Sequence, residues 1–176
     1  MDRTIRTIGK SILFVSMIAA GCSSPSGPSP PGPPSGPSIS PDEAAVREAF
    51  TAFQAALKVN DAATVWELLD SDSRADAERA AKALQAEYSK ASPEDKAQRE
   101  KELGLTAAEL AALTGKGFVK SKRFIGKYDE VPDSKIKTVT VQGDKATVLY
   151  VEPDDDEVKL SAVRESGKWK LTVPMK

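Results

Sequence analysis

The 176-residue chain contains no histidine and only one cysteine, Cys22. Histidine is the side chain whose ordinary pKa suits proton transfer near pH 7, so the commonest general base is absent. A single cysteine cannot form an internal disulfide, and the fold must be stabilised by its core alone. The sequence also lacks a Ser-His or Cys-His pair, a metal-ligand spacing and a glycine-rich phosphate loop. These absences argue against an enzyme, a bound metal and a cofactor.

Long hydrophobic runs are also absent. The apolar run near the N-terminus covers nine residues, 12–20, and follows a basic segment that contains Arg3, Arg6 and Lys10. At 1.5 Å per residue a helix of this length covers roughly 14 Å, less than half of a bilayer core of about 30 Å. The run is therefore too short to span a membrane, and its length is typical of the apolar part of a signal peptide.

The order of basic head, short apolar run, small residues and Cys22 resembles the signal peptide and lipobox of bacterial lipoproteins. The resemblance implies that residues 1–21 are removed and that Cys22 carries the lipid. It also implies a protein anchored in the bacterial cell envelope and facing the periplasm, with Ser23 compatible with the outer membrane. The position three before the cysteine, usually leucine in this family, is Ala19. The alternative is an ordinary signal peptide that leaves Cys22 as a free thiol.

A tether is expected over residues 22–40. Residues 23–38 are serine, proline and glycine only, so they have no apolar surface to bury. Proline-rich segments extend by about 3.1 Å per residue, which gives this segment a reach of up to ~50 Å. The alternative use of such a segment is as a ligand for a proline-recognition domain. Without residues 1–21 the chain carries 22 basic and 25 acidic residues, a balance that gives no indication of nucleic-acid binding.

Residues 41–176 are long enough for one domain, and their first half predicts helices. Ser40 is an expected N-cap, Pro41 takes the first helical position, and Val46, Phe50, Phe53 and Leu57 then form one apolar face. Further helix starts are expected at Asp61, in the segment 71–73, at Ser92 and at Thr106, and the last of these helices is expected to continue to about Lys120.

From Lys135 the apolar period changes to two, which predicts β-strands. Turn residues at 143–144, 153–156 and 166–167 divide the segment into four antiparallel strands, each with one apolar side. A one-sided sheet must be covered, and the preceding amphipathic helices are the available cover. The fold class expected is α+β, with helices packed on a four-stranded antiparallel sheet.

Two segments carry a resemblance to the NTF2-like (cystatin-like α+β cone) superfamily: the helical stretch Val46–Leu69 and the last strand, Gly167–Leu171, which reads GKWKL. The resemblance covers most of residues 41–176 and implies helices packed on a curved sheet that forms a cone. The long helical stretch around 73–120 is an insertion relative to that pattern, placed where it can reshape or fill the mouth of the cone.

Three groups of side chains are candidates for binding. Large aromatic residues are expected to line a pocket between helices and sheet, or else to pack in the core: Trp66, Tyr88, Phe118, Phe124, Tyr150 and Trp169. The acidic run Asp154–Glu157 is either a divalent-cation site or a solvated turn. A basic run is expected either to contact anionic lipid headgroups or to form a solvated helix end: Lys116, Lys120, Lys122, Arg123 and Lys127.

The sequence therefore predicts a lipid-anchored, extracytoplasmic, non-catalytic protein whose NTF2-like domain binds a partner protein or a small ligand. One alternative is a small cone-type enzyme that uses a carboxylate or a tyrosine. The other is a structural envelope lipoprotein without a ligand.

Overall fold

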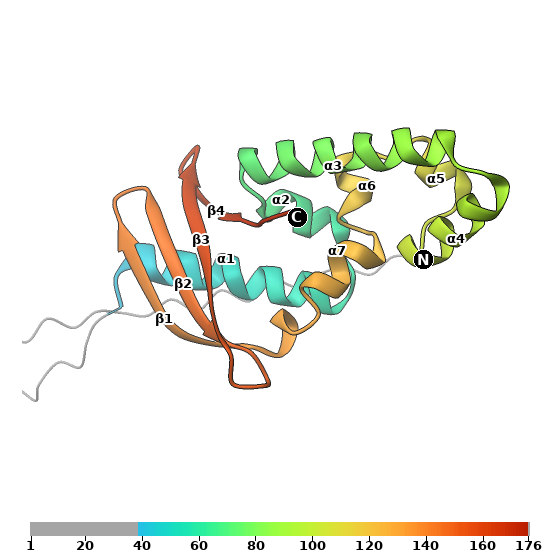
Figure 1. Ribbon diagram of the computed structural model, residues 1–176. Coiled ribbons are helices and arrows are strands. Elements are labelled where there is room, and N and C mark those ends of the chain that lie inside the picture. The colour runs from blue at the N-terminus through green and yellow to red at the C-terminus, as the bar shows by residue number, and fades with distance from the viewer. Residues whose placement is uncertain (1–38, 176) are drawn as a thin grey trace, which may run out of the picture. The chain divides into compact units, whose positions relative to one another are not determined.

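Helices come first and strands last along the described chain (Figure 1). The computed structural model describes residues 39–175, so the expected signal peptide, Cys22 and residues 22–38 of the tether lie outside the described residues. The helices are α1 (Pro41–Lys58), α2 (Ala62–Leu68), α3 (Ser71–Lys90), α4 (Pro93–Leu103), α5 (Ala107–Ala111), α6 (Gly115–Phe118) and α7 (Lys122–Lys127), followed by a 3₁₀ turn, η1 (Val131–Asp133). The strands are β1 (Lys135–Gln142), β2 (Lys145–Val151), β3 (Glu157–Glu165) and β4 (Lys168–Thr172).

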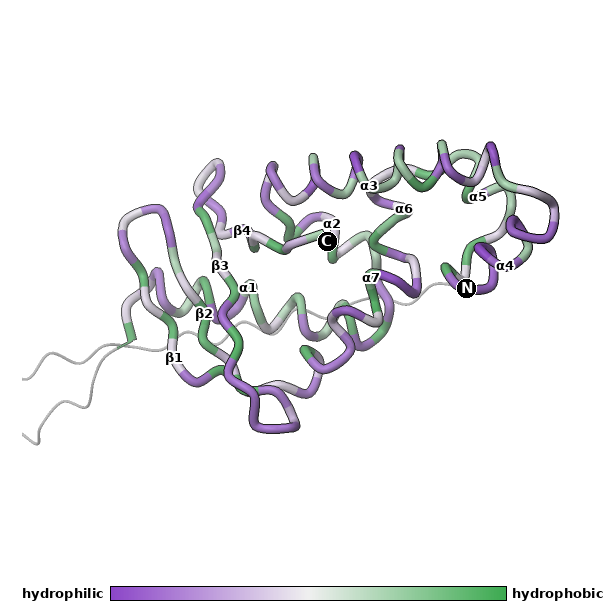
Figure 2. The backbone as a smooth tube through the Cα atoms, viewed as in Figure 1, coloured by the Kyte–Doolittle hydropathy of each residue, from purple (hydrophilic) through white to green (hydrophobic). Residues whose placement is uncertain are grey.

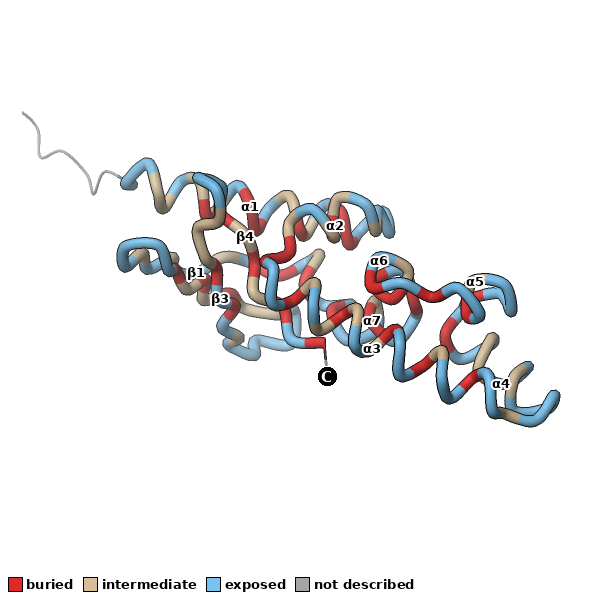
Figure 3. Tube along the Cα trace, turned by 90° about the horizontal axis from the view of Figure 1, so that it is seen from above, coloured by how far each residue is buried: buried red, intermediate tan, exposed pale blue. Residues whose placement is uncertain are grey.

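Helix α1 covers the apolar face of the sheet. Ser40 accepts the Glu43 backbone N–H on its Oγ at 3.1 Å, so the predicted cap is confirmed. Val46, Phe50 and Phe53 are fully buried, and the helix packs against β1, β2 and β4. Figure 3 shows buried positions recurring along α1 and along the strands. The apolar spacing read from the sequence therefore marks the face that meets the sheet. Within the described residues, no helix is both long and apolar enough to cross a bilayer.

The four strands form an antiparallel meander in the order β1-β2-β3-β4. Adjacent strands pair Val139 with Val148, Val148 with Leu160, and Ala162 with Leu171, so the apolar side chains share one face. Figure 2 shows hydrophobic and hydrophilic residues alternating along the strands. Two-residue hairpin turns join β1 to β2 and β3 to β4, and Gly143 in the first turn and both Ser166 and Gly167 in the second adopt positive φ. The predicted α+β class, strand number and pairing are confirmed.

The segment between α2 and α3 covers the outer edge of β4. Leu69 forms a parallel bridge with Leu171, and the backbone N–H of Asp70 donates to the Leu171 carbonyl at 3.0 Å. Asp70 is 3 % exposed, and its carboxylate accepts the Ser73 backbone N–H at 2.7 Å and the Thr172 hydroxyl at 2.5 Å. The cap of α3 is therefore Asp70, and the prediction of a cap in 71–73 is wrong by one to three residues.

Helices α3 to α6 form the helical extension, residues 71–118. Helix α3 leads away from the sheet, and α4 and α5 lie at its far end (Figures 1 and 3). Gly104 ends α4 with a φ of 64°, as its position in the sequence predicts. The helix predicted from Thr106 to about Lys120 is wrong beyond Ala111. Thr114 caps a new helix by accepting the Gly117 N–H at 3.2 Å, and a Cβ at Gly115 would lie 2.8 Å from the Glu78 backbone nitrogen of α3. Close packing of α6 on α3 therefore interrupts the predicted helix at this point.

Candidate functional site

Five of the six aromatic residues expected to line a pocket are buried, and the sixth, Trp66, is half-buried. The rings of Phe118 and Phe124 meet edge to face with their centroids 6.3 Å apart, and both residues are 2 % exposed. The ring of Tyr150 is tilted against Phe50 of α1 at 5.0 Å. Aromatic contacts of this kind are typical of a core.

Among residues 39–175, no ring contact joins Trp66, Tyr88 or Trp169 to these rings or to one another. The Arg74 guanidinium lies 5.6 Å from the Trp66 ring, and the Arg164 guanidinium lies 4.8 Å from the Trp169 ring. The Tyr88 hydroxyl, on the helical extension, donates to Glu100 at 2.6 Å. The structure therefore brings together one pair of the six, Phe118 with Phe124, and ligand binding by the set stays a prediction.

Buried tyrosines bear on the alternative of a cone-type enzyme. Burial first, and then the charge of Glu152, raise the pKa of Tyr150 to about 12. Burial also raises the pKa of Tyr128, whose hydroxyl donates to the Pro174 carbonyl at 2.5 Å. Both phenols therefore hold their protons more firmly than an ordinary tyrosine, which disfavours a phenolate base at these positions.

The acidic run folds into the turn between β2 and β3, as one alternative predicts. Carboxylate oxygens of Glu130, Glu152 and Asp154 lie within 4.8 Å of one another. Charge repulsion, from Asp154 first, raises the pKa of Glu130, while burial followed by the Glu130 charge raises that of Glu152. The sequence predicts a candidate cation site that includes Asp154 but gives no indication of Glu130 and Glu152 beside it. Exposed acidic clusters are common at turns, and proximity alone does not assign an ion to this one.

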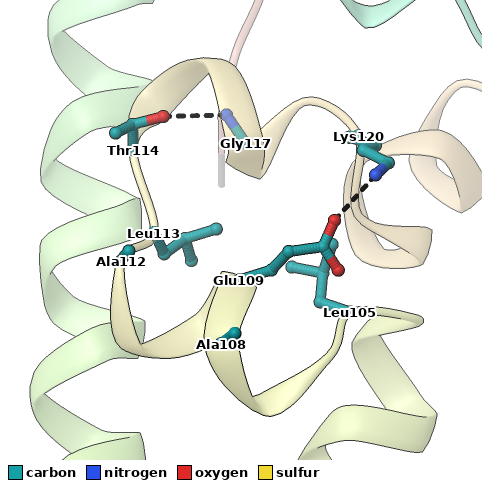
Figure 4. A pocket seen from close by; sticks show the side chains of 8 residues that line it. All are labelled: Leu105, Ala108, Glu109, Ala112, Leu113, Thr114, Gly117 and Lys120. Carbon is teal, nitrogen blue, oxygen red and sulfur yellow. Dashed lines mark hydrogen bonds and ion pairs between the residues drawn. The ribbon is translucent and has the colours of Figure 1, made fainter.

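An apolar groove opens on the helical extension around α5 and α6 (Figure 4), with a volume of about 350 Å³. Its walls are mainly hydrocarbon, from Leu105, Ala108, Ala112 and Leu113, and its polar groups come from Glu109, Thr114, Gly117 and Lys120. Volumes of this order hold small ligands, and pockets of that kind combine apolar walls with a few placed polar groups. We refer to these eight residues as the α5–α6 groove.

Local sequence explains the walls of the groove. Thr106 and Glu109 form a capping box that starts α5, and Leu105 before it is 4 % exposed. Gly117 has no side chain, and a Cβ there would lie 3.1 Å from Leu113 Cδ1. The groove is therefore open because small residues stand beside two leucines.

A charged pair stands beside the apolar walls. Figure 4 shows Glu109 and Lys120 reaching toward each other, and Lys120 Nζ lies 2.7 Å from Glu109 Oε1. The Lys120 bond, followed by the bonds to Thr106, lowers the pKa of Glu109 to about 2. Glu109 is therefore ionised throughout the physiological pH range, and the pair offers one negative and one positive group to a ligand.

The basic run is partly used within the protein. Besides Lys120, Lys122 donates to the Lys101 carbonyl at 3.4 Å. Lys127 donates to the Pro174 carbonyl at 3.1 Å and lies 5.6 Å from the Tyr128 ring centroid. Lys116 and Lys127 lie in the last turns of α6 and α7, as the helix-end alternative predicts, whereas Lys122 begins α7. Contact of the run with lipid headgroups stays a prediction.

Two of the predicted pocket residues line other openings. Tyr88 lines one of about 540 Å³ together with Lys82 and Lys96, and Lys96 Nζ lies 5.6 Å from the Tyr88 ring centroid. Trp169 lines another of about 380 Å³, between α1 and the β3–β4 turn. Both openings expose more polar surface than the α5–α6 groove, so the groove is the better apolar site.

Sequence reasoning missed most of the α5–α6 groove because it searched for aromatic residues, and of the eight lining residues it had singled out Lys120 as a binding candidate. The available signal was a second cap, Thr114 with Gly117 three residues later, within a run rich in alanine and glycine. Such a cap predicts a broken helix, and small residues at a break leave space beside their larger neighbours. Comparison of the chain with protein-family models, with curated proteins and with solved structures finds no match.

Proposed function

We propose that the chain is a lipid-anchored, extracytoplasmic, non-catalytic binding protein, and that its ligand is a small amphipathic molecule held in the α5–α6 groove. The observation that carries the proposal is the combination of apolar walls and the Glu109–Lys120 pair in one opening of about 350 Å³. The apolar walls favour a ligand with a hydrocarbon or aromatic body. The charged pair favours a ligand with a polar or ionised end.

An NTF2-like domain is part of this proposal. Support comes from α1 lying across the apolar face of a four-stranded antiparallel meander, with α2 following it directly. In this arrangement the interior is occupied by ring contacts such as Phe50 with Tyr150. The proposed ligand site therefore lies on the inserted helical extension and not inside the cone.

A fluorescence titration of the full chain with 1-anilinonaphthalene-8-sulfonate, an aromatic probe with one negative charge, tests the groove. Ala108→Phe fills the groove and is expected to weaken probe binding at least tenfold. Ala107→Phe is the matched control because Ala107 is also exposed on the first turn of α5 but does not line the groove. Circular dichroism must show both variants folded, because this probe also binds loosely packed states.

Equal probe binding by both variants, or no binding by the full chain, would exclude the groove as the site. Native mass spectrometry of the full chain isolated from its host then identifies the class of ligand. A retained small molecule that is lost in Ala108→Phe and kept in Ala107→Phe supports the proposal.

The lipid anchor has its own test. Intact-mass analysis of protein from the membrane fraction is expected to show loss of residues 1–21 and added acyl mass. Two or more acyl chains suffice for stable anchoring, so Cys22→Ser should move the protein out of the membrane fraction. A membrane-bound protein with an unmodified Cys22 would contradict the assignment.

A further inference from the structure

The two edges of the sheet are closed to different degrees. The outer edge of β4 is covered by Leu69 and Asp70 through a parallel bridge and a backbone hydrogen bond to Leu171. The outer edge of β1 has no pairing segment among residues 39–175. An open edge presents unpaired backbone N–H and C=O groups, and a second strand can add to it.

Only the first half of β1 carries the features that block such pairing. Lys135 and Lys137 are charged, the register shifts between Ile136 and Thr138, and Lys137 forms an ion pair with Glu157. Charges and register irregularities of this kind are what natural edge strands use against pairing. The first half is therefore protected.

The second half of β1, the segment Thr138–Gln142, has none of these features. It reads Thr-Val-Thr-Val-Gln, without charge, proline or glycine. Val139 and Val141 point to the core face but are only half-buried at this edge. Their uncovered area is the apolar surface that an added strand would bury.

The same segment is complementary to itself. In an antiparallel pairing with a two-fold axis at Thr140, Val139 of one copy lies opposite Val141 of the other, and Thr140 lies opposite Thr140. Thr138 then lies opposite Gln142. Because side chains alternate between the two faces, this register keeps both valine pairs on the core face. No like charges meet within the five paired positions.

We propose that a second copy of this chain pairs with the β1 edge through Thr138–Gln142, so that two four-stranded sheets join into one continuous sheet. Five residues per copy bury much less area than the roughly 1,600 Å² of a standard stable interface. The dimer is therefore expected to be weak and dependent on concentration. The groove on the helical extension takes no part in it, and this inference stands or falls independently of the proposed ligand.

Sedimentation velocity of the full chain over a series of concentrations tests the dimer. The chain carries Cys22→Ser throughout, so that no lipid holds copies together. Thr140→Lys and Thr140→Glu each place like charges opposite one another at the two-fold axis and are expected to raise the dimer dissociation constant at least tenfold. An equal mixture of the two is expected to recover the dimer. Ser161→Lys, exposed on the central strand β3, is the matched control and should leave dimerisation unchanged.

A disulfide crosslink tests whether the two-fold axis of the dimer lies at Thr140. In the Cys22→Ser background, Thr140→Cys is expected to form a disulfide-linked dimer under mild oxidation, while Ser161→Cys is not. A chain that stays monomeric at every concentration overturns the proposal. A dimer that Thr140→Lys leaves intact, or that crosslinks as readily through Ser161→Cys, overturns it as well, because it uses another surface.

Discussion

Replacing Asp70 with alanine removes two hydrogen bonds in a buried place. Its carboxylate caps α3 through Ser73 and accepts the Thr172 hydroxyl, and it is 3 % exposed. Loss of an N-cap costs about 0.5–2 kcal/mol, and leaving a buried polar group without its partner costs about 1–3 kcal/mol. Asp70→Ala should therefore lower the free energy of unfolding by about 2–4 kcal/mol. For a urea m-value of about 2 kcal/mol per M, the unfolding midpoint falls by about 1–2 M.

Asp61 provides the matched control. It also caps a helix, α2, by accepting the backbone N–H groups of Ala63 and Thr64 at 3.1 Å, but it is exposed. Water can replace the lost acceptor there, so Asp61→Ala should lower the midpoint clearly less than Asp70→Ala. Asp70→Asn keeps one acceptor oxygen and should fall between Asp70→Ala and the unmodified chain. Urea unfolding followed by circular dichroism measures all three, and equal losses for the two alanine variants would refute the argument from burial.

Two further predictions concern the helical extension and the helix that follows it. Gly115→Ala should destabilise the fold by about 1–3 kcal/mol, because the added Cβ would lie 2.8 Å from the Glu78 backbone nitrogen. At Gly126 an added Cβ would meet no atom within 4 Å, so Gly126→Ala should stabilise the fold by about 0.5–1 kcal/mol in the same urea assay. Lys120 is the main cause of the lowered pKa of Glu109, so this carboxylate stabilises the fold above pH 4.5 and loses that contribution as the pH falls towards 2. Melting temperatures between pH 2 and 5 should therefore change less steeply in Lys120→Met, and an unchanged slope would contradict the ion pair.

The strands could be predicted from the sequence because their signals are local. Alternation in β2 places Ala146, Val148 and Tyr150 on one face, and all three are buried. The turns at Gly143 and Gly167 carry the positive φ that their residue types favour. Register follows from these two features, since a slip by one residue would turn the apolar side chains to solvent.

Four of the five predicted helix starts are confirmed, and one of them, Asp61, caps α2 although Asn60 beside it is also a possible cap. Ser40, Ser92 and Thr106 each stand alone before their helix, and each caps as expected. The segment from Asp70 to Ser73 offers several residues that can cap, and the choice of Asp70 depends on its bond to Thr172, a strand residue 102 positions away in sequence. Such a long-range contact is invisible to a local pattern.

The surroundings of the aromatic residues could not be predicted for a related reason. Sequence spacing places Phe118, Phe124 and Tyr150 on apolar faces, but whether a face meets a cavity or another ring depends on packing between elements. The structure pairs Phe118 with Phe124 and places Tyr150 against Phe50. The groove instead lies where side chains are small.

The error in the helix prediction and the location of the groove have one physical cause. In a continuous helix from 107 to 120, Glu109 and Lys120 would be eleven residues apart, or about 16 Å along the axis, beyond the reach of an ion pair at 2.7 Å. The pair forms because α5 ends at Ala111 and a new helix starts at Gly115, so that Lys120 lies within reach of Glu109. Thr114 and Gly117, which stop the helix, also line the groove. Substitutions that restore helix propensity here would therefore remove the groove and the ion pair together.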